Sequence, residues 1–134
     1  SLCRMLVVID EAAELFLAGP YSKSEATQRA RKIMIRLAAQ GRAVGLNLVI
    51  ATQRPDVNAV DSQVKANLAG ILSFRMSNLA SSMTVLGNGR AAELAQVKGR
   101  GLWKVGSEMQ EIQSPNLLDT EVIKYIGITN EDLR

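Results

Sequence analysis

Short apolar runs alternate with stretches of helical periodicity along most of the chain. The first run covers Met5 to Asp10, the second Leu46 to Thr52, and the third Gly70 to Met76. Strands that alternate with helices are typical of βαβ units, whose strands lie parallel in one sheet. The pattern therefore predicts an α/β fold with a mainly parallel sheet flanked by helices.

The segments between these runs have the spacing of helices. The longest ends at about Gln40, its apolar side chains fall three and four positions apart, and either Ser22 or Ser24 can cap its start. Two further strands, Gly101–Val105 and Met109–Ser114, follow a group of glycines, and we expect them to form a hairpin at the sheet edge. The shorter helices that we expect are Val57–Ala66, Ser81–Leu86, Arg90–Gln96 and Asp119–Ile126.

The composition narrows the class of protein. A chain of 134 residues with 47% apolar and 22% charged residues has enough apolar material for one folded domain, which argues against disorder. It contains no histidine, and its single cysteine, Cys3, cannot form an internal disulfide, so a conventional zinc site is excluded and a reducing cytosol is favoured. The longest apolar run, Met5 to Ile9, is far shorter than the roughly 20 residues that cross a bilayer. These features predict a cytoplasmic domain.

The net charge of +3 is unevenly distributed. Residues 1–54 carry eight Lys and Arg against four Asp and Glu, whereas residues 101–134 carry three against six. A basic body with an acidic end is compatible with a nucleic-acid partner.

Two carboxylates follow the first apolar run directly. Asp10 and Glu11 close a buried strand, which has the form of a Walker B segment in P-loop nucleotide hydrolases. In such segments the Asp holds Mg²⁺ and the Glu prepares the attacking water. An apolar strand that ends in two acids also occurs by chance in other α/β proteins, so a second feature is needed.

That feature is the polar pair Thr52-Gln53, which closes the second run. Ligands of parallel sheets bind beyond the carboxyl ends of the strands, where both polar pairs are expected to lie. Gln53 would then sit beside the γ-phosphate, bond water and phosphate through its amide, and signal the nucleotide state to the following loop. The phosphate-binding loop itself, G-x-x-x-x-G-K-[ST], occurs nowhere in the 134 residues.

The segment from Leu37 to Pro55, ending in Ala-Thr-Gln-Arg-Pro, resembles the signature of FtsK/SpoIIIE-type DNA-translocating ATPases, which reads approximately R-A-x-G-I-H-L-x-x-A-T-Q-R-P. Val64-Lys65-Ala66-Asn67 is similar to the I-K-A-N segment of that family. Its late A-E…G-x-G-x-L region is matched by Ala92-Glu93-Leu94 and Gly99-Arg100-Gly101-Leu102. The resemblance runs from Leu6 to about Val105.

The resemblance implies a RecA-like P-loop core and a hexameric motor that hydrolyses ATP with Mg²⁺ and pumps double-stranded DNA through its channel. Relatives act in chromosome segregation, in conjugation as coupling proteins, and in type VII protein secretion. Residues 1–134 would be the C-terminal part of one such ATPase domain, with Walker A in a preceding part. This chain alone would then be inactive, and any membrane association would come from parts outside it.

By the same resemblance, Asp10 contacts the metal, Glu11 and Gln53 are catalytic, and Thr52 and Gln53 contact the nucleotide. Arg42 and Lys65 match basic positions of the family and are assigned to phosphate, subunit or DNA contacts.

The sequence departs from the family where an arginine finger is expected. Many translocases carry Thr-Arg shortly after I-K-A-N, whereas this chain has Gly70-Ile71, and Ser81-Ser82-Met83 replaces a downstream Asp-Ser-Arg. Arg75 is a candidate substitute. These changes favour the coupling-protein and secretion branches, with DNA or a secretion substrate as cargo. The alternative is a non-enzymatic interaction module built on a degenerate ATPase-like domain.

Overall fold

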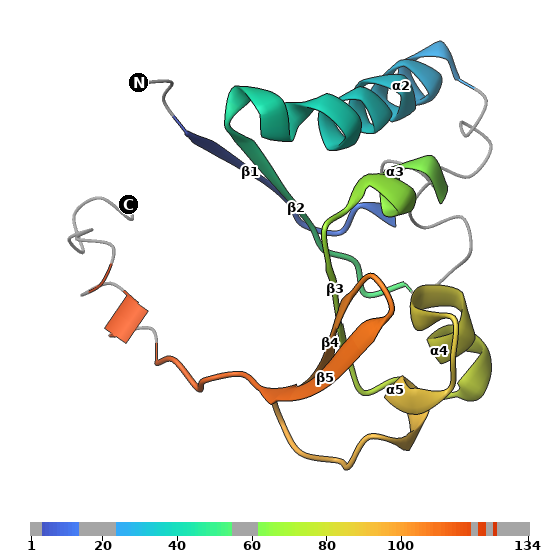
Figure 1. Cartoon of the computed structure of the whole chain (residues 1–134), viewed down its shortest axis with the longest axis vertical. Coiled ribbons are helices and arrows are strands. Elements are labelled where there is room, and N and C mark those ends of the chain that lie inside the picture. Colours follow the sequence, from blue (N-terminus) through green and yellow to red (C-terminus); the bar gives the residue numbers. More distant parts are fainter. Residues whose placement is uncertain (1–3, 14–23, 55–61, 119–120, 123–124, 126–134) are drawn as a thin grey trace.

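The computed structural model describes residues 4–13, 24–54, 62–118, 121–122 and 125 (Figure 1). Strands β1 (Met5–Ile9) and β2 (Leu46–Ile50) pair in parallel, with Met5 opposite Leu46 and Ile9 opposite Ile50. The predicted βαβ unit is therefore present. Its register places the carboxyl ends of both strands at the same edge.

Helix α2 (Glu25–Gln40) connects these strands and ends where the sequence predicts. Ser24 caps it, because its Oγ accepts a hydrogen bond from the Thr27 N–H at 3.2 Å. A short 3-10 helix, η1 (Gly41–Val44), follows, and Gly45 turns the chain into β2 with a φ of 80°, which a residue without Cβ adopts most easily.

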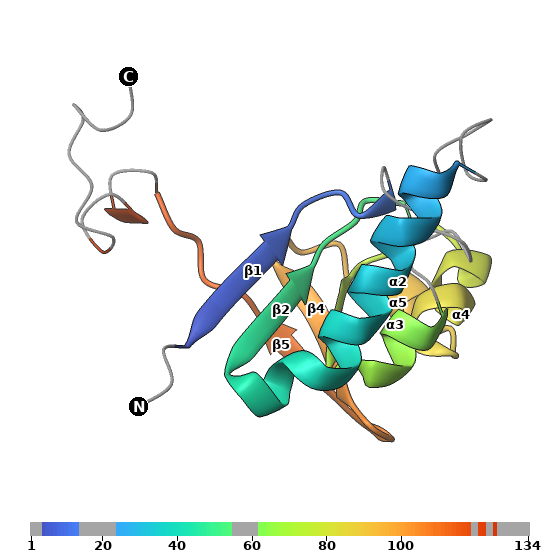
Figure 2. The ribbon, with the colours of Figure 1, turned by 90° about the horizontal axis from the view of Figure 1, so that it is seen from above.

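A first apolar cluster lies between α2 and the parallel strands. Ala12, Met34 and Val64 are its buried members. Val64 comes from helix α3 (Ser62–Asn67), which packs against α2, and both helices lie on one side of β1 and β2 (Figure 2). The first part of the predicted helix Val57–Ala66 lies outside the described residues. This cluster fixes the backbone immediately after β1, because Ala12 follows Glu11.

The second sheet is antiparallel. Strand β3 (Ile71–Phe74) pairs with β4 (Arg100–Val105), which pairs in turn with β5 (Glu108–Gln113). The α/β class and the C-terminal hairpin are confirmed, but placing the third strand in a parallel sheet is wrong in the described pairings. Exposure alternates along β3, where Ser73 is buried between exposed neighbours, and this one-sided burial is typical of antiparallel strands.

A second apolar cluster covers one face of this sheet. It consists of Leu86, Ala91, Leu94 and Leu102, contributed by β4, by helices α4 (Leu79–Leu86) and α5 (Arg90–Glu93), and by the segment after α5. Helix α4 begins two residues earlier than predicted because Asn78 caps it, its Oδ1 accepting from the Ser81 N–H at 2.8 Å.

The last predicted helix, Asp119–Ile126, is described only in part. Glu121, Val122 and Tyr125 are helical, and the other positions lie outside the described residues. Among the described residues, no helix has the length and apolar character needed to cross a membrane.

The second cluster predicts a clear difference between two leucines. Leu102 is 1% exposed in the cluster, whereas Leu79 on α4 is 61% exposed. We expect Leu102→Ala to lower the free energy of unfolding by about 3 kcal/mol, because it removes buried methyl groups and leaves a cavity. Leu79→Ala should change it by less than about 1 kcal/mol. Urea denaturation followed by circular dichroism measures both, and equal losses would contradict the assignment of the core.

Candidate functional site

The carboxyl ends of β1 and β2 are joined beyond the strands themselves. The Ala51 N–H donates to the Ile9 carbonyl at 2.8 Å, and the Ala12 N–H donates to the Ala51 carbonyl at 2.8 Å. These two bonds hold the Asp10-Glu11 pair beside the Thr52-Gln53 pair. The two polar pairs thus lie together, as their positions at neighbouring strand ends predict.

Both carboxylate oxygens of Glu11 accept hydrogen bonds from the end of β2. The Thr52 hydroxyl donates to Oε1 at 2.6 Å, and the Gln53 N–H donates to Oε2 at 2.9 Å. The Ala13 backbone also acts on this carboxylate as a donor. A carboxylate offers about four acceptor positions, so Glu11 keeps room for one further donor. Glu11 is therefore held in place and can still accept a bond from water.

These donors lower the pKa of Glu11 below its ordinary value. The largest cause is the hydrogen bond from Thr52, and the backbone bond from Gln53 is the next. Partial burial acts in the opposite direction, and the charge of Arg54 lowers the pKa a little further. Hydrogen bonds to the ionised form favour that form, so Glu11 is a carboxylate at neutral pH.

The backbone of Glu11 has an unusual conformation. Its φ is 51°, in the left-handed region, and Glu11 is the single non-glycine residue with positive φ in the described part of the chain. Such a conformation costs about 1–3 kcal/mol in a residue with a side chain and is often found at functional sites. The Glu11 N–H donates to Asp10 Oδ1 at 3.1 Å, which steadies this turn. Nothing in the sequence signals it, because glutamate has no preference for positive φ.

The Thr52 hydroxyl links three parts of the site. It donates to Glu11 and accepts a hydrogen bond from the Arg54 N–H at 3.1 Å. A hydroxyl that accepts from the backbone two residues on is a common local turn of threonine. The sequence assigns Thr52 to the nucleotide, and that assignment stays a prediction; in the structure its hydroxyl contacts Glu11.

Gln53 contributes through its backbone in this structure. Its N–H holds Glu11, and its side chain is exposed. The amide group is therefore open to solvent at the edge where the prediction places the γ-phosphate.

The basic candidates lie at different places. Arg42 is in η1, which precedes β2, so the length of that strand, about 15 Å, separates it from Thr52. The structure does not bring Arg42 to the Glu11 site. Lys65 lies on α3, next to Val64, which belongs to the cluster that also contains Ala12. No hydrogen bond or ion pair joins Lys65 to Asp10 or Glu11 among the described residues.

Arg75 follows β3, and its Nε donates to the Leu94 carbonyl at 3.0 Å. Its guanidinium is thus tied to the segment after α5, and it makes no described contact with Glu11. Arg75 belongs to a second location, at the end of β3.

The residues at the strand ends fit Mg²⁺ in the form in which nucleotide hydrolases use it. Asp10 is exposed, and with Oδ1 accepting the Glu11 N–H, its other oxygen is open. No group of three or more His, Cys, Asp or Glu side chains that could hold a metal occurs in the described part of the chain. Mg²⁺ commonly takes one or two carboxylates and completes its shell with substrate phosphates and water. The donor set therefore suits a metal that arrives with a nucleotide.

Known proteins resemble this chain over most of its length. Residues 1–57 match the model of the FtsK/SpoIIIE family. DNA translocase FtsK of Mesorhizobium japonicum is 32% identical over 92% of this chain and 13% of its own length. DNA translocase FtsK of Clostridium tetani is 34% identical over 95% of this chain and 16% of its own length. The chain thus spans about a seventh of the length of these relatives.

Solved structures agree with the sequence matches. The pCW3 conjugation coupling protein TcpA, solved as a monomer with ATPgS, superposes with a TM-score of 0.78 and is 36% identical, covering 84% of this chain and 32% of its own. The cytoplasmic domain of the type VII secretion ATPase EccC from Thermomonospora curvata superposes with a TM-score of 0.68 at 24% identity, covering 83% of this chain and 12% of its own. The second likeness is evidence for the fold alone.

The Glu11 contacts predict a pH-dependent difference between two Thr52 variants. Thr52→Val removes the hydroxyl that is the main cause of the lowered pKa, so the pKa of Glu11 should rise toward its ordinary value. Thr52→Ser keeps a hydroxyl and should leave the pKa low. Nuclear magnetic resonance of the Glu11 carboxyl carbon between about pH 2 and pH 7 measures this.

The sign of the accompanying stability effect follows from the lowered pKa. The hydrogen bonds to Glu11 stabilise the fold above the ordinary carboxyl pKa, and this contribution is lost as the pH falls through the lowered value. In Thr52→Val the free energy of unfolding should therefore fall less as the pH is lowered. In Thr52→Ser it should fall as much as in the unchanged protein. Identical titrations of the two variants would show that the hydroxyl does not hold Glu11.

The ordered motifs, the paired strand ends, the family model and the curated relatives lead to one assignment. This chain has the P-loop ATPase motor fold, and it belongs to the FtsK/SpoIIIE family.

Proposed function

We propose that this chain is the Walker B and sensor part of an ATP-driven motor that moves double-stranded DNA, or a secretion substrate, through a ring of subunits. The observation that carries the proposal is the pair of hydrogen bonds that Thr52 and Gln53 donate to the Glu11 carboxylate. It brings a carboxylate from one strand and polar groups from its neighbour to one point, which is the arrangement that water activation beside a γ-phosphate requires.

Glu11 acts in this proposal mainly by orienting water. Its pKa is lowered, so it is a weak base and gains little by removing a proton completely. Its carboxylate keeps an open acceptor position, which can take a hydrogen of the attacking water. Positioning and electrostatic stabilisation carry most of the catalysis in phosphoryl transfer, so a fixed acceptor suffices.

Asp10 holds the nucleotide-bound Mg²⁺ through its open carboxylate oxygen. The ion supplies charge neutralisation for the phosphate oxygens when it is bound. Asp10 Oδ1 meanwhile keeps the Glu11 N–H engaged, so metal binding and the orientation of Glu11 are linked through one backbone bond.

The same contacts give a route from the nucleotide to the rest of the motor. Glu11 bonds both the Gln53 backbone N–H and the Thr52 hydroxyl, and that hydroxyl holds the Arg54 N–H. A shift of Glu11 is therefore passed to the Arg54 backbone. Arg54 leads directly into residues 55–61. Gln53 thereby senses the presence of the γ-phosphate and passes it along the backbone to the segment after β2.

The partners follow from the relatives. DNA translocase FtsK proteins and a conjugation coupling protein are similar to this chain at 30% identity or more, which supports DNA as the cargo. A hexamer is the assembly that we infer for the whole motor. The likeness to TcpA also supports the coupling-protein branch, as do Gly70-Ile71 where many translocases carry Thr-Arg.

The chain alone should not turn over ATP. It contains no G-x-x-x-x-G-K-[ST] segment, so the backbone cradle and lysine that bind phosphates are not supplied by these residues. A coupled-enzyme assay should give no rate above buffer for residues 1–134. The same residues joined to a family phosphate-binding loop should hydrolyse ATP, and faster with duplex DNA. Robust turnover by residues 1–134 would contradict the proposal that phosphate binding depends on residues outside them. Inactivity of both forms would favour a non-enzymatic interaction module.

Glu11→Gln should separate binding from hydrolysis in the joined protein. The amide keeps the size of the side chain but loses the charge that orients water, so kcat should fall by about a hundredfold or more while nucleotide affinity stays within about twofold. Glu108→Gln, at the exposed start of β5, is the matched control and should leave kcat unchanged. Unchanged turnover in Glu11→Gln would remove Glu11 from its role.

A further inference from the structure

A second polar location lies away from Glu11, where the end of β3 meets the segment between α5 and β4. A shallow pocket of about 330 Å³ opens there, and its lining contains two cations and no acid. The lining residues are Arg75, Met76, Ser77, Gln96, Val97 and Lys98.

The first cation, Arg75, is fixed by its own side chain. Its Nε donates to the Leu94 carbonyl at 3.0 Å, which uses one of five guanidinium N–H groups and leaves four. The wall around it is tied to α5, because the Met76 N–H donates to the Ala91 carbonyl at 3.0 Å. Arg75 therefore presents its remaining donors from a fixed position.

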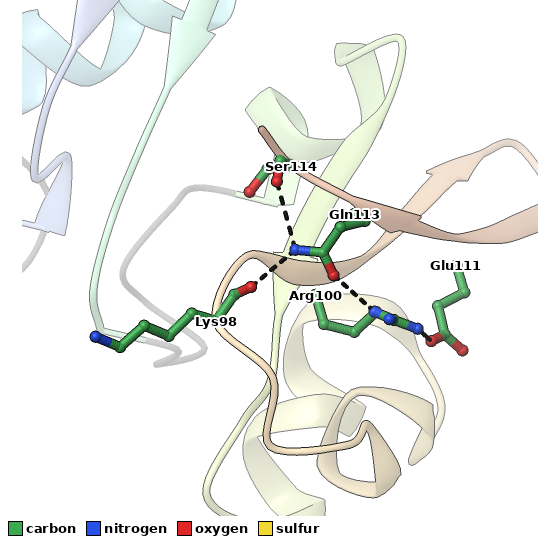
Figure 3. A network of polar contacts seen from close by, with 5 residues as sticks. All are labelled: Lys98, Arg100, Glu111, Gln113 and Ser114. Carbon is green, nitrogen blue, oxygen red and sulfur yellow. Dashed lines mark hydrogen bonds and ion pairs between the residues drawn. The ribbon is translucent and has the colours of Figure 1, made fainter. Parts of the chain in front are cut away.

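The second cation, Lys98, is fixed through its backbone. Gln113 Nε2 donates to the Lys98 carbonyl at 2.8 Å, and Gln113 Oε1 accepts from Arg100 Nε at 2.9 Å. Figure 3 shows that the Lys98 side chain extends away from this network. The hairpin thus holds the base of Lys98 and leaves its ammonium group for another partner.

Within the described part of the chain, no ion pair neutralises Arg75 or Lys98. Glu111 is on the same network, but it is paired with Arg100 at 2.5 Å. The Ser77 hydroxyl accepts from Asn78 Nδ2 at 3.3 Å, so its own hydrogen can still be donated into the pocket. The pocket therefore offers a fixed Arg75 guanidinium, the ammonium of Lys98 on a fixed backbone, and a hydroxyl donor.

We propose that the Arg75–Lys98 pocket binds a phosphate group, supplied either by a nucleotide or by the backbone of a nucleic acid. A planar guanidinium beside an ammonium suits phosphate oxygens, which accept several charge-assisted hydrogen bonds at once. Preorganisation lowers the entropy lost on binding, because the Arg75 side chain and the backbone of Lys98 are already held. The sequence signalled Arg75 alone, and Lys98 joins it only through the fold.

Two probes test the pocket and identify the source of the phosphate. Tripolyphosphate represents a nucleotide, and a short DNA duplex represents a nucleic-acid backbone. We expect at least one of them to shift the backbone amide resonances of Ser77, Gln96 and Lys98, with weaker binding as salt rises. A response to tripolyphosphate alone assigns the pocket to nucleotides, and a response to the duplex alone assigns it to nucleic acid. Shifts confined to other parts of the chain, or no shifts, would overturn the proposal.

Charge-neutral variants supply the control. Lys98→Gln keeps the backbone carbonyl that the hairpin holds, so it should fold normally and weaken binding of the active probe about fivefold. Arg75→Gln should weaken it at least as much, and its thermal unfolding shows whether loss of the Leu94 contact disturbs the fold. Arg4→Gln removes one exposed charge before β1 and should leave the dissociation constant within about twofold. If Lys98→Gln and Arg4→Gln raised the dissociation constant equally, binding would depend on overall charge and not on the pocket. That result would overturn the proposal. This test requires no hydrolysis, so it stands or falls separately from the role of Glu11.

Discussion

The pairing of two parallel strands past their own ends is the constraint on which the site depends. The Ala51 backbone both donates to Ile9 and accepts from Ala12, so the chain after β1 is locked to the chain after β2. Glu11 lies between the residues that these two hydrogen bonds join, and its backbone there has a left-handed conformation. Ala12 is fully buried against Met34 and Val64, and this packing stabilises the same stretch of backbone. The strain at Glu11 is thus maintained by packing and by backbone hydrogen bonds.

This arrangement decides what Glu11 can do. A carboxylate that accepts from Thr52 and Gln53 is ionised, oriented and poor at taking up a proton. Such a group suits a reaction in which water has to be aimed more than deprotonated. The donors come from the end of β2, where Gln53 is the proposed sensor, so in the proposed mechanism Glu11 and Gln53 belong to one hydrogen-bonded unit. A chemical step and a mechanical response can share it without any further contact.

Much of this could be predicted from the sequence, because the informative signals are local. The apolar run before Asp10 and the run before Thr52 mark strands of the right length, and parallel pairing brings their ends to one edge. The cap at Ser24 and the glycine at Gly45 set the ends of the connecting segments. The resemblance from Leu37 to Pro55 supplied the roles that no local pattern contains.

What could not be predicted depends on contacts distant in sequence. The direction of β3 follows from its pairing with β4, which lies some thirty residues later, and the short apolar run at Ile71 is equally compatible with a parallel strand. The positive φ of Glu11 is set by contacts of its neighbours, and Lys98 lines the same pocket as Arg75 through a segment whose carbonyl Gln113 holds. For Arg42 the sequence suggested a functional residue that the fold does not bring to the Glu11 site, because Arg42 lies before β2, at the opposite end from Thr52.

The central claim is that Asp10 holds a metal that arrives with the nucleotide, and that Glu11 and the end of β2 lie beside it. Iron-directed cleavage tests it most directly, because radicals formed at a bound iron ion cut the nearest backbone. The experiment uses residues 1–134 joined to a family phosphate-binding loop, with Fe²⁺ in place of Mg²⁺. The account predicts cuts near Asp10–Ala12 and near Ala51–Arg54 that require a nucleotide and are lost in Asp10→Asn. Cuts at other places, or cuts at these places without nucleotide, would contradict it.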